Sequence, residues 1–165
     1  MENSTTLKQN IAAVNEIIVD DGGIEVPVKN MSGEQVGVFY FHPTDIGIID
    51  RYNKIIGDFE KITEPLAQIS IKQDGTTDND EESAALKEAE KRLYEAVDYM
   101  FGGNMSEAFF GSMHPFSPVN GAFYCERAIE AVGKYISTQF DRETAKIKKR
   151  VGRYTKKYKN RGGKH

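Results

Sequence analysis

The chain has no tryptophan and only one cysteine, Cys125, among its 165 residues. A single cysteine can form neither an internal disulfide nor a cysteine-rich zinc site, and a free thiol favours a reducing compartment. The first ten residues are polar and lack the apolar stretch of a secretory signal. No apolar run approaches the roughly 20 residues that span a bilayer. We therefore expect a cytoplasmic protein with no membrane segment.

The sequence also lacks a credible set of catalytic or metal-binding residues. No two of the three histidines, His42, His114 and His165, have the spacing of metal ligands. Cys125 falls on the apolar stripe of a predicted helix, where packing is its expected role. No pocket is expected to join His42, His114 or Cys125 to acids within hydrogen-bonding distance. The prediction is a protein that is not an enzyme and has no cofactor or metal.

The segment 72–82 is rich in acids and has no apolar anchor, which is typical of a flexible loop. Asp74, Thr76 and Asp78 could occupy the first positions of an EF-hand calcium loop. Asn79 then takes the position that requires glycine, and Ala85 takes that of the last glutamate. The pattern therefore indicates a solvated linker.

Charge is distributed unevenly along the chain. Residues 141–165 contain eleven Lys or Arg and two acids, whereas the remaining residues contain eleven Lys or Arg and twenty-three acids. The net charge of −3 hides this division. A basic end on an acidic body indicates an interaction segment, because such a division sets electrostatic fields and partners more than it sets the fold.

The N-terminal part predicts a small sheet after an arm at 1–15, in which Leu7, Ile11 and Val14 have helical spacing. Three strands are expected, at Glu16–Val19, Ile24–Lys29 and Gln35–Phe41, joined by Asp/Gly-rich and Gly-containing turns into an antiparallel meander. Pro27 lacks an amide donor and favours an edge strand. No strand is expected beyond residue 45.

Helices are predicted for most of the chain after residue 45. Pro43 ends the sheet, and Thr44 or Asp45 can cap a helix whose apolar stripe is Ile49, Tyr52, Ile56, Phe59, Ile62, Leu66 and Ile69. A second helix, from about Ser83 to Met100, has the stripe Leu86, Ala89, Leu93, Val97 and Met100. Gly102 and Gly103 should end it.

A short helix over Met105–Phe110 is expected next, with Asn104 and Glu107 at capping-box spacing and Gly111 at its end. Ser117 and Pro118 are typical of the start of the last helix. Its core stripe is Cys125, Ile129, Val132, Ile136 and Phe140, and the same spacing continues through Thr144, Ile147, Val151, Tyr154 and Tyr158.

The predicted fold class is therefore α+β and predominantly helical. A small N-terminal antiparallel β-meander is followed by a helical bundle and a long basic C-terminal helix. We expect a single domain over 16–140 and a basic helical extension over 141–165.

Three roles fit the basic extension. It could bind a partner protein through its apolar stripe while its cations steer association. It could bind nucleic acid, with tyrosines available for stacking, or it could be a solvated tail. The acidic body repels phosphate and argues against nucleic acid as the main ligand. The candidate partner-binding residues are Ile147, Lys148, Lys149, Arg150, Val151, Arg153, Tyr154, Lys156, Lys157 and Tyr158.

The order of three short motifs suggests a family. Phe41-His42-Pro43-Thr44-Asp45 leaves the sheet, Asp98-Tyr99-Met100-Phe101-Gly102-Gly103 ends the second helix, and Glu107-Ala108-Phe109-Phe110-Gly111 comes next. Over roughly residues 24–140 the chain resembles the tail assembly chaperones of long-tailed bacteriophages and related prophages. The positions that match the family pattern are Pro43, Thr44, Asp45, Phe101, Gly102, Phe110 and Gly111.

The resemblance implies a protein of the host bacterial cytoplasm that binds the phage tape measure protein and self-associates during tail assembly. The residues themselves suit such a role, because a chaperone of a long helical protein needs apolar docking stripes and no active site. The matching Phe-Gly pairs also have a structural explanation, with glycine ending a helix and phenylalanine packing. Two alternatives stay open: another phage structural or head–tail connector protein, and a small nucleic-acid-binding regulator that uses the basic helix.

Overall fold

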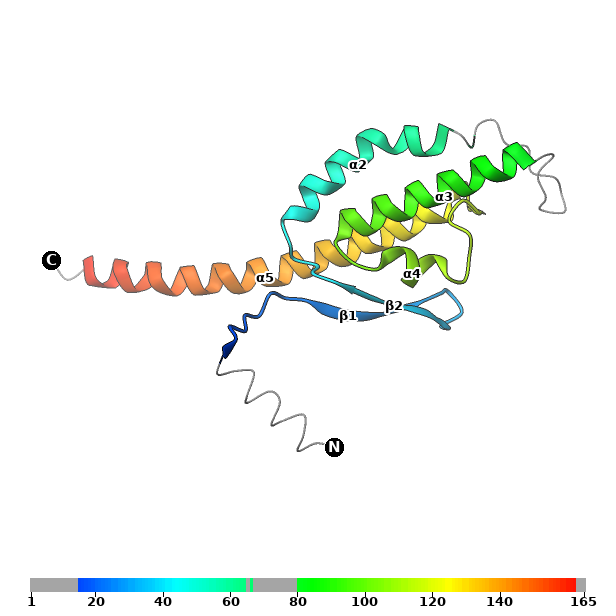
Figure 1. Cartoon of the computed structure of the whole chain (residues 1–165). Coiled ribbons are helices and arrows are strands. Elements are labelled where there is room, and N and C mark those ends of the chain that lie inside the picture. Colours follow the sequence, from blue (N-terminus) through cyan, green and yellow to red (C-terminus); the bar gives the residue numbers. More distant parts are fainter. Residues whose placement is uncertain (1–14, 65, 67–79, 163–165) are drawn as a thin grey trace.

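The computed structural model describes residues 15–64, 66 and 80–162. A β-hairpin and three helices form one body with the first half of a long helix, α5, whose second half projects away from them (Figure 1). The predicted class, α+β and predominantly helical, is confirmed. Leu7, Ile11, Val14, Ile69 and most of the predicted 72–82 loop lie outside the described residues.

The sheet is a two-stranded hairpin of β1 (Ile24–Lys29) and β2 (Gln35–Phe41). The strands pair antiparallel, and the register shifts at the end of β1 nearest the turn. Gly33 supplies the positive φ, 82°, that the turn requires. The side chain of Asn30 accepts the amide N–H groups of Ser32 and Glu34, each at 3.0 Å. These contacts fix the hairpin turn.

The first strand of the predicted meander does not form, so the three-stranded prediction was wrong at Glu16–Val19, which is neither strand nor helix. The turn after this segment directs the chain away from the hairpin. Asp20 Oδ1 accepts the Gly22 N–H and Asp21 Oδ1 accepts the Gly23 N–H, each at 3.0 Å. These side chains hold a local turn that leaves the preceding segment unpaired within the described residues.

Helix α2 (Gly47–Thr63) begins after Ile46. Asp45 Oδ1 accepts the N–H of Gly47 at 2.9 Å and so satisfies a first-turn amide, a role predicted for Thr44 or Asp45. The other Asp45 oxygen pairs with Arg51 at 3.0 Å.

The apolar stripe predicted for α2 was wrong in its first half. Ile49, Tyr52 and Ile56 are exposed, whereas the face turned to the core carries Ile48, Arg51, Ile55, Phe59 and Ile62. Ile48, Ile55, Phe59 and Ile62 form an alternative apolar stripe, and this one packs on the core. Arg51 lies on the same face, where its Nε donates to the carbonyl of Met100 at the end of the next helix, at 3.0 Å.

Helix α3 (Asp80–Phe101) begins earlier than predicted, so residues 80–82 are helical and not part of a loop. Three consecutive acids in its first turn, Asp80, Glu81 and Glu82, suit the positive end of the helix dipole. The predicted core stripe is confirmed: Ala89, Leu93, Val97 and Met100 are buried and Leu86 packs against them.

Helix α3 ends as predicted at Gly102, whose φ is 63°. The N–H of Gly102 donates to the Tyr99 carbonyl at 3.3 Å, and the N–H of Gly103 donates to the Asp98 carbonyl at 3.2 Å. This pair of bonds is a Schellman motif, which satisfies carbonyls that a helix end leaves free.

Helix α4 (Met105–Phe110) has the predicted bounds but not the predicted cap. The Asn104 side chain makes no cap hydrogen bond. Asp98 takes that role from α3, since its carboxylate accepts the Ser106 N–H at 2.7 Å and the Ser106 hydroxyl at 2.6 Å. The capping-box prediction was therefore wrong, because a carboxylate distant in sequence is better placed.

A second, minute hairpin precedes the last helix. Strands β3 (Pro118–Val119) and β4 (Ala122–Phe123) pair antiparallel around Asn120 and Gly121, whose φ values are 50° and 83°. The expectation of no strand beyond residue 45 was wrong, and so was a helix start at Ser117-Pro118. An Asn-Gly pair is the strongest short hairpin signal, and this one outweighs the helix-start signal.

The first half of helix α5 (Tyr124–Gly162) packs in the core, and its second half, from residue 141 onward, projects from the body. Cys125, Ala128 and Val132 are buried between the hairpin and the other helices. Ile129, Ile136 and Phe140 are half-buried as the helix leaves the body. From residue 141 to 153 every side chain is exposed.

Candidate functional site

The projecting part of α5 carries apolar side chains in water. Ile147 and Val151 lie four residues apart on one face and are each 50% exposed. They continue the spacing of Phe140 and Thr144 from the body. The Thr144 hydroxyl donates a hydrogen bond to the Phe140 carbonyl at 2.8 Å. This side chain therefore leaves no free donor on the stripe. The predicted apolar stripe therefore extends onto a helix that no described residue covers.

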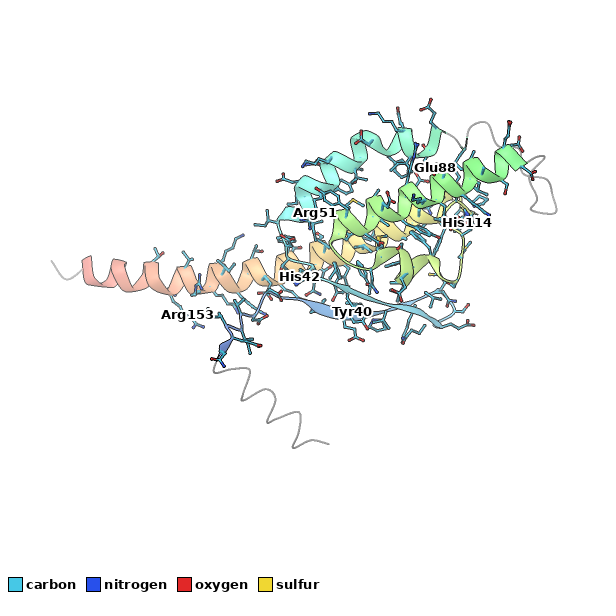
Figure 2. All side chains as sticks on the ribbon, viewed as in Figure 1. Tyr40, His42, Arg51, Glu88, His114 and Arg153 are labelled. Carbon is cyan, nitrogen blue, oxygen red and sulfur yellow. The ribbon has the colours of Figure 1, made fainter. Side chains whose placement is uncertain are left out.

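Cations surround this stripe. Lys148, Lys149, Arg150, Arg153 and Lys156 are exposed and form no ion pair with any described residue. Figure 2 shows Arg153 on the projection, far from the labelled residues of the body. Like charges one helical turn apart, as at Lys149 and Arg153, destabilise an isolated helix. The projection thus presents both apolar area and uncompensated positive charge.

The side chains of three predicted partner-binding residues, Tyr154, Lys157 and Tyr158, lie outside the described part of the chain. Their backbone continues α5. The remaining seven predicted residues, from Ile147 to Lys156, are brought together on adjacent turns of one helix.

A second apolar surface lies on α2 and was not predicted. Ile46 is 70% exposed, Ile49 and Ile56 are each 53% exposed, and Tyr52 is 38% exposed. Acidic side chains, among them Asp50 and Asp58, are exposed on the same helix. The signal was present in the sequence, but Ile49, Tyr52 and Ile56 were predicted to face the core.

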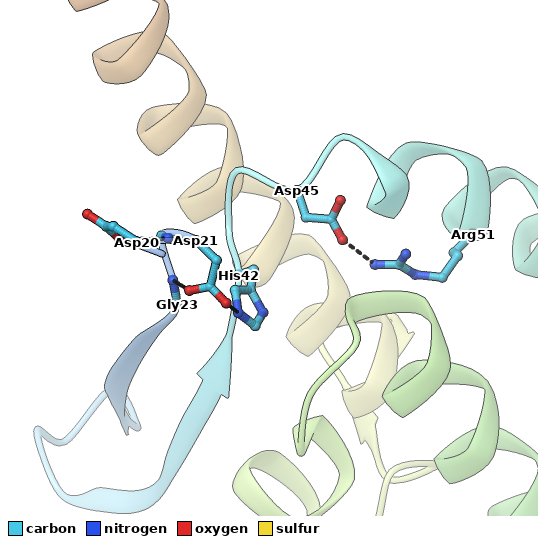
Figure 3. Close-up of polar contacts among 7 residues, drawn as sticks. Asp20, Asp21, Gly23, His42, Asp45 and Arg51 are labelled. Atoms are coloured by element: carbon cyan, nitrogen blue, oxygen red, sulfur yellow. Dashed lines mark hydrogen bonds and ion pairs between the residues drawn. The ribbon is translucent and has the colours of Figure 1, made fainter. Parts of the chain in front are cut away.

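The structure brings a histidine to an acid at the rim of a groove, a contact that the sequence did not predict. Nε2 of His42 lies 2.7 Å from Oδ2 of Asp21 (Figure 3). His42 also lines a groove of about 510 Å³. The hydrogen bond from the Gly23 N–H lowers the pKa of Asp21 below its usual value, and the hydrogen bond to His42 lowers it further. A second contact joins His114 Nε2 to Glu90 Oε2 at 3.3 Å.

The chemistry of the groove is nevertheless poor. The residues that line it are Gly23, Ile24, Glu25, Tyr40, Phe41, His42, Gly102, Gly103 and Asn104. None of them carries a hydroxyl of Ser or Thr, a thiol or an ammonium group. The two paired side chains are 44% and 64% exposed, so water competes with any bound substrate. The pair is better placed to hold the turn before β1 than to transfer a proton.

Cys125 is fully buried on the core face of α5, where packing was predicted. Burial, aided by the neighbouring Glu126, raises the pKa of its thiol to about 12.

We therefore expect Cys125 to resist thiol reagents at pH 8 in the folded protein. The thiolate fraction at pH 8 should be on the order of 1,000-fold lower than for an ordinary cysteine. Labelling by a chromogenic disulfide reagent would measure this, with the urea-unfolded chain as the control. Rapid labelling of the native protein would show that the thiol is accessible.

The positions of the aromatic-Pro-Thr-Asp motif hold the joint between sheet and helices. Pro43 is buried at the end of β2 and Thr44 is half-buried. Asp45 fixes the start of α2 and pairs with Arg51 (Figure 3). Arg51 in turn bonds to the end of α3. Arg51 is a structural residue that periodicity could not reveal, because its partner is a backbone carbonyl of another helix.

The Phe-Gly pairs also have structural roles. Phe101 is buried, and Gly102 adopts the positive φ that ends α3. Phe110 stacks on Tyr94 with ring centroids 5.6 Å apart, and Gly111 lies just past the end of α4. These contacts account for the phenylalanines as core residues.

Asn104 joins α4 to the sheet. Its Oδ1 accepts the Tyr40 N–H at 2.8 Å and its Nδ2 donates to the Val38 carbonyl at 3.0 Å. The amide therefore occupies the outer edge of β2 in the manner of another strand. No pattern in the sequence points to this role.

Among the described residues, no group of three or more His, Cys, Asp or Glu side chains could hold a metal ion. Within the same residues, each helix is too short or too polar to cross a membrane.

Comparison of the chain with models of protein families, with curated proteins and with solved structures gives no match.

Proposed function

We propose that this chain is a non-enzymatic, tail assembly chaperone-like protein that binds a tape measure protein and self-associates during phage tail assembly. The observation that carries the proposal is the projecting half of α5, on which Ile147 and Val151 are exposed among unpaired cations. An uncovered apolar stripe on a helix that leaves its own domain is a surface for a partner.

The spacing of the stripe favours a helical partner. Phe140, Thr144, Ile147 and Val151 succeed one another at steps of four, three and four. Such steps form the seam of paired helices, in which apolar side chains of one helix pack between those of the other. A tape measure protein is long and helical, so it offers this seam many times.

The cations give this surface a preference for acidic partners. Charges beside an apolar seam raise the association rate and select the partner more than they add affinity. The chain itself has an acidic body, so a second copy also fits the basic end.

We expect oligomers whose average mass rises with protein concentration and falls as salt is added. Opposite charges on the body and on residues 141–165 attract neighbouring copies, and salt screens exposed charges over roughly 8–10 Å at physiological ionic strength. Sedimentation velocity at several salt concentrations measures this. An average mass that salt leaves unchanged would contradict an electrostatic contribution to association.

The proposed function can be tested by co-expression with the tape measure protein encoded nearest to this gene. The full chain should keep that protein in the soluble fraction and co-purify with it. The matched control is a chain that ends at residue 140, which retains the core but lacks the projection. Equal solubility of the tape measure protein with both chains, or with neither, would contradict the proposal.

Nucleic-acid binding is the second candidate, because six exposed cations of the projection, Arg142 among them, have no ion-pair partner among the described residues. Phosphate neutralisation requires cations but has no need for the register of Ile147 and Val151. The surplus of acids on the body opposes it.

A further inference from the structure

We propose that residues Glu16–Val19 of one copy add as a third, antiparallel strand to the free edge of β1 in a second copy of this chain. The inference goes beyond the proposed function, because it concerns a different surface and needs no phage partner.

The donor is a strand-forming segment without a sheet. Ile17, Ile18 and Val19 are consecutive β-branched residues, which favour strands. They are 97%, 78% and 76% exposed and lie in neither strand nor helix. Three adjacent apolar side chains in water are costly, and an intermolecular strand would cover them.

The acceptor is the outer edge of β1. The bonds from Asn104 to the Tyr40 N–H and the Val38 carbonyl show that residues 38 and 40 point their backbone groups away from β1. Their partners in β1, Pro27 and Glu25, must therefore point outward on the opposite side. No described residue bonds to the outward N–H or carbonyl of Glu25, nor to the carbonyl of Pro27.

These groups define a short pairing site. Glu25 offers one donor and one acceptor, and Pro27 offers an acceptor alone because proline has no N–H. In an antiparallel register that places Ile18 opposite Glu25, these two residues exchange two backbone hydrogen bonds. Glu16 then lies opposite Pro27 and donates one more. The site thus matches the short segment Glu16–Val19.

The same register places apolar side chains correctly. Ile17 falls opposite Val26, whose side chain faces the core side of the sheet together with Val28. On that side lies a hollow of about 180 Å³ between β1 and α5, with Phe109, Val132 and Tyr135 among its walls. Ile17 and Val19 point toward that side, because alternate residues of a strand share a face.

The occupant is a second copy because the chain carries both halves of the pairing but does not join them. The register is the one that a closed hairpin of Glu16–Val19 with β1 would have. Asp21 instead bonds to His42 and to the Gly23 N–H, and the segment leaves the open end of the hairpin (Figure 1). In domain swapping, a segment that does not pair within its own chain pairs with the same site in a second copy.

Two variants test the proposal in the full chain. Ile18→Pro removes a donor N–H from the segment, and Glu25→Pro removes the outward N–H of β1 without touching a bond to β2. Proline is already tolerated two residues along, at Pro27. The matched controls, Ile18→Thr and Glu25→Thr, keep the N–H groups. Circular dichroism and thermal unfolding verify that each variant folds.

Sedimentation velocity at about 0.5 M salt suppresses association through exposed charges, since the screening length is then roughly 4 Å. The parent chain and both threonine controls should associate, whereas each proline variant alone should be monomeric. An equal mixture of the two proline variants should form a one-to-one dimer, because one supplies an intact segment and the other an intact edge.

A monomeric parent chain under these conditions would overturn the proposal, as would proline variants that associate like the parent. A mixture that stays monomeric would also overturn it, whereas a Glu25→Pro chain that associates like the parent would indicate two segments pairing with each other. If Glu25→Pro fails to fold, a labelled peptide of residues 15–21 decides instead. It should bind the Ile18→Pro chain and a scrambled peptide should not, and equal binding of the two peptides would refute the site. Loss of tape measure binding by the projection leaves all these outcomes unchanged.

Discussion

Replacing Ile147 and Val151 together with aspartate should abolish binding of the tape measure protein to this chain. Both side chains are exposed, so the change leaves the core and its stability intact. In the complex it places two charges in an apolar contact, which costs several kcal/mol. We expect affinity to fall by at least roughly 100-fold, since every 1.4 kcal/mol is about tenfold. Isothermal titration against a purified helical segment of the tape measure protein measures this.

The matched variant replaces Lys148, Lys149 and Lys156 with glutamine. It removes three cations from the same turns and leaves the apolar stripe in place. Association should become slower and less sensitive to salt, whereas the dissociation rate should change little. If the glutamine variant loses more affinity than the aspartate variant, charge and not the apolar seam is the main contact.

Gly103→Ala should markedly destabilise the folded protein. A Cβ at this position would overlap the carbonyl oxygen of Tyr40 and lie 3.1 Å from the Cβ of Phe41. Both neighbours belong to β2, so relief requires the end of α3 to move away from the sheet. We expect the free energy of unfolding to fall by about 3 kcal/mol, the upper end of ordinary overpacking. The melting temperature should fall by about 6–12 °C.

Gly57→Ala is the control for this prediction. Gly57 lies within α2, and a Cβ there would meet no atom within 4 Å. Alanine in a helix interior is favoured over glycine by roughly 0.5–1 kcal/mol. The melting temperature should therefore rise slightly for this variant. A Gly103→Ala protein as stable as the parent would show that α3 and β2 are not held as closely as described.

The sequence predicted elements whose determinants are local. The stripe from Ala89 to Met100 has one period and one face, so α3 and its burial can be deduced from it. Gly102 and Gly33 end their elements because only glycine adopts a positive φ at little cost. In these cases the residue and its cause lie within a few positions of each other.

The errors arose where a distant group decides. On α2, Arg51 lies on the inward face and bonds to the Met100 carbonyl, whereas Ile49 and Ile56 are exposed. Asp98 displaces Asn104 as the cap of α4, and Asn104 instead bonds to β2. Periodicity measures apolar side chains alone and cannot detect such polar contacts.

The candidate site was predicted in part. The apolar register and the cations of residues 147–156 are visible in the sequence, and the helix places them on adjacent turns. Their exposure depends on where the body ends, and the last described residue of α5 that packs against the core is Ile136. The contact between His42 and Asp21 was missed because the two residues lie 21 positions apart and only the fold brings the turn before β1 beside the end of β2.

The most direct test of the proposed function is a parallel titration at physiological salt. The full chain is titrated with a helical tape measure segment, with duplex DNA and with single-stranded RNA, and each titration is repeated with the two variants of the α5 projection. We expect that the helical segment binds, that the Ile147→Asp, Val151→Asp variant does not bind it and that the lysine-to-glutamine variant still does. Tight binding of either nucleic acid that is lost in the lysine-to-glutamine variant would contradict the proposed function.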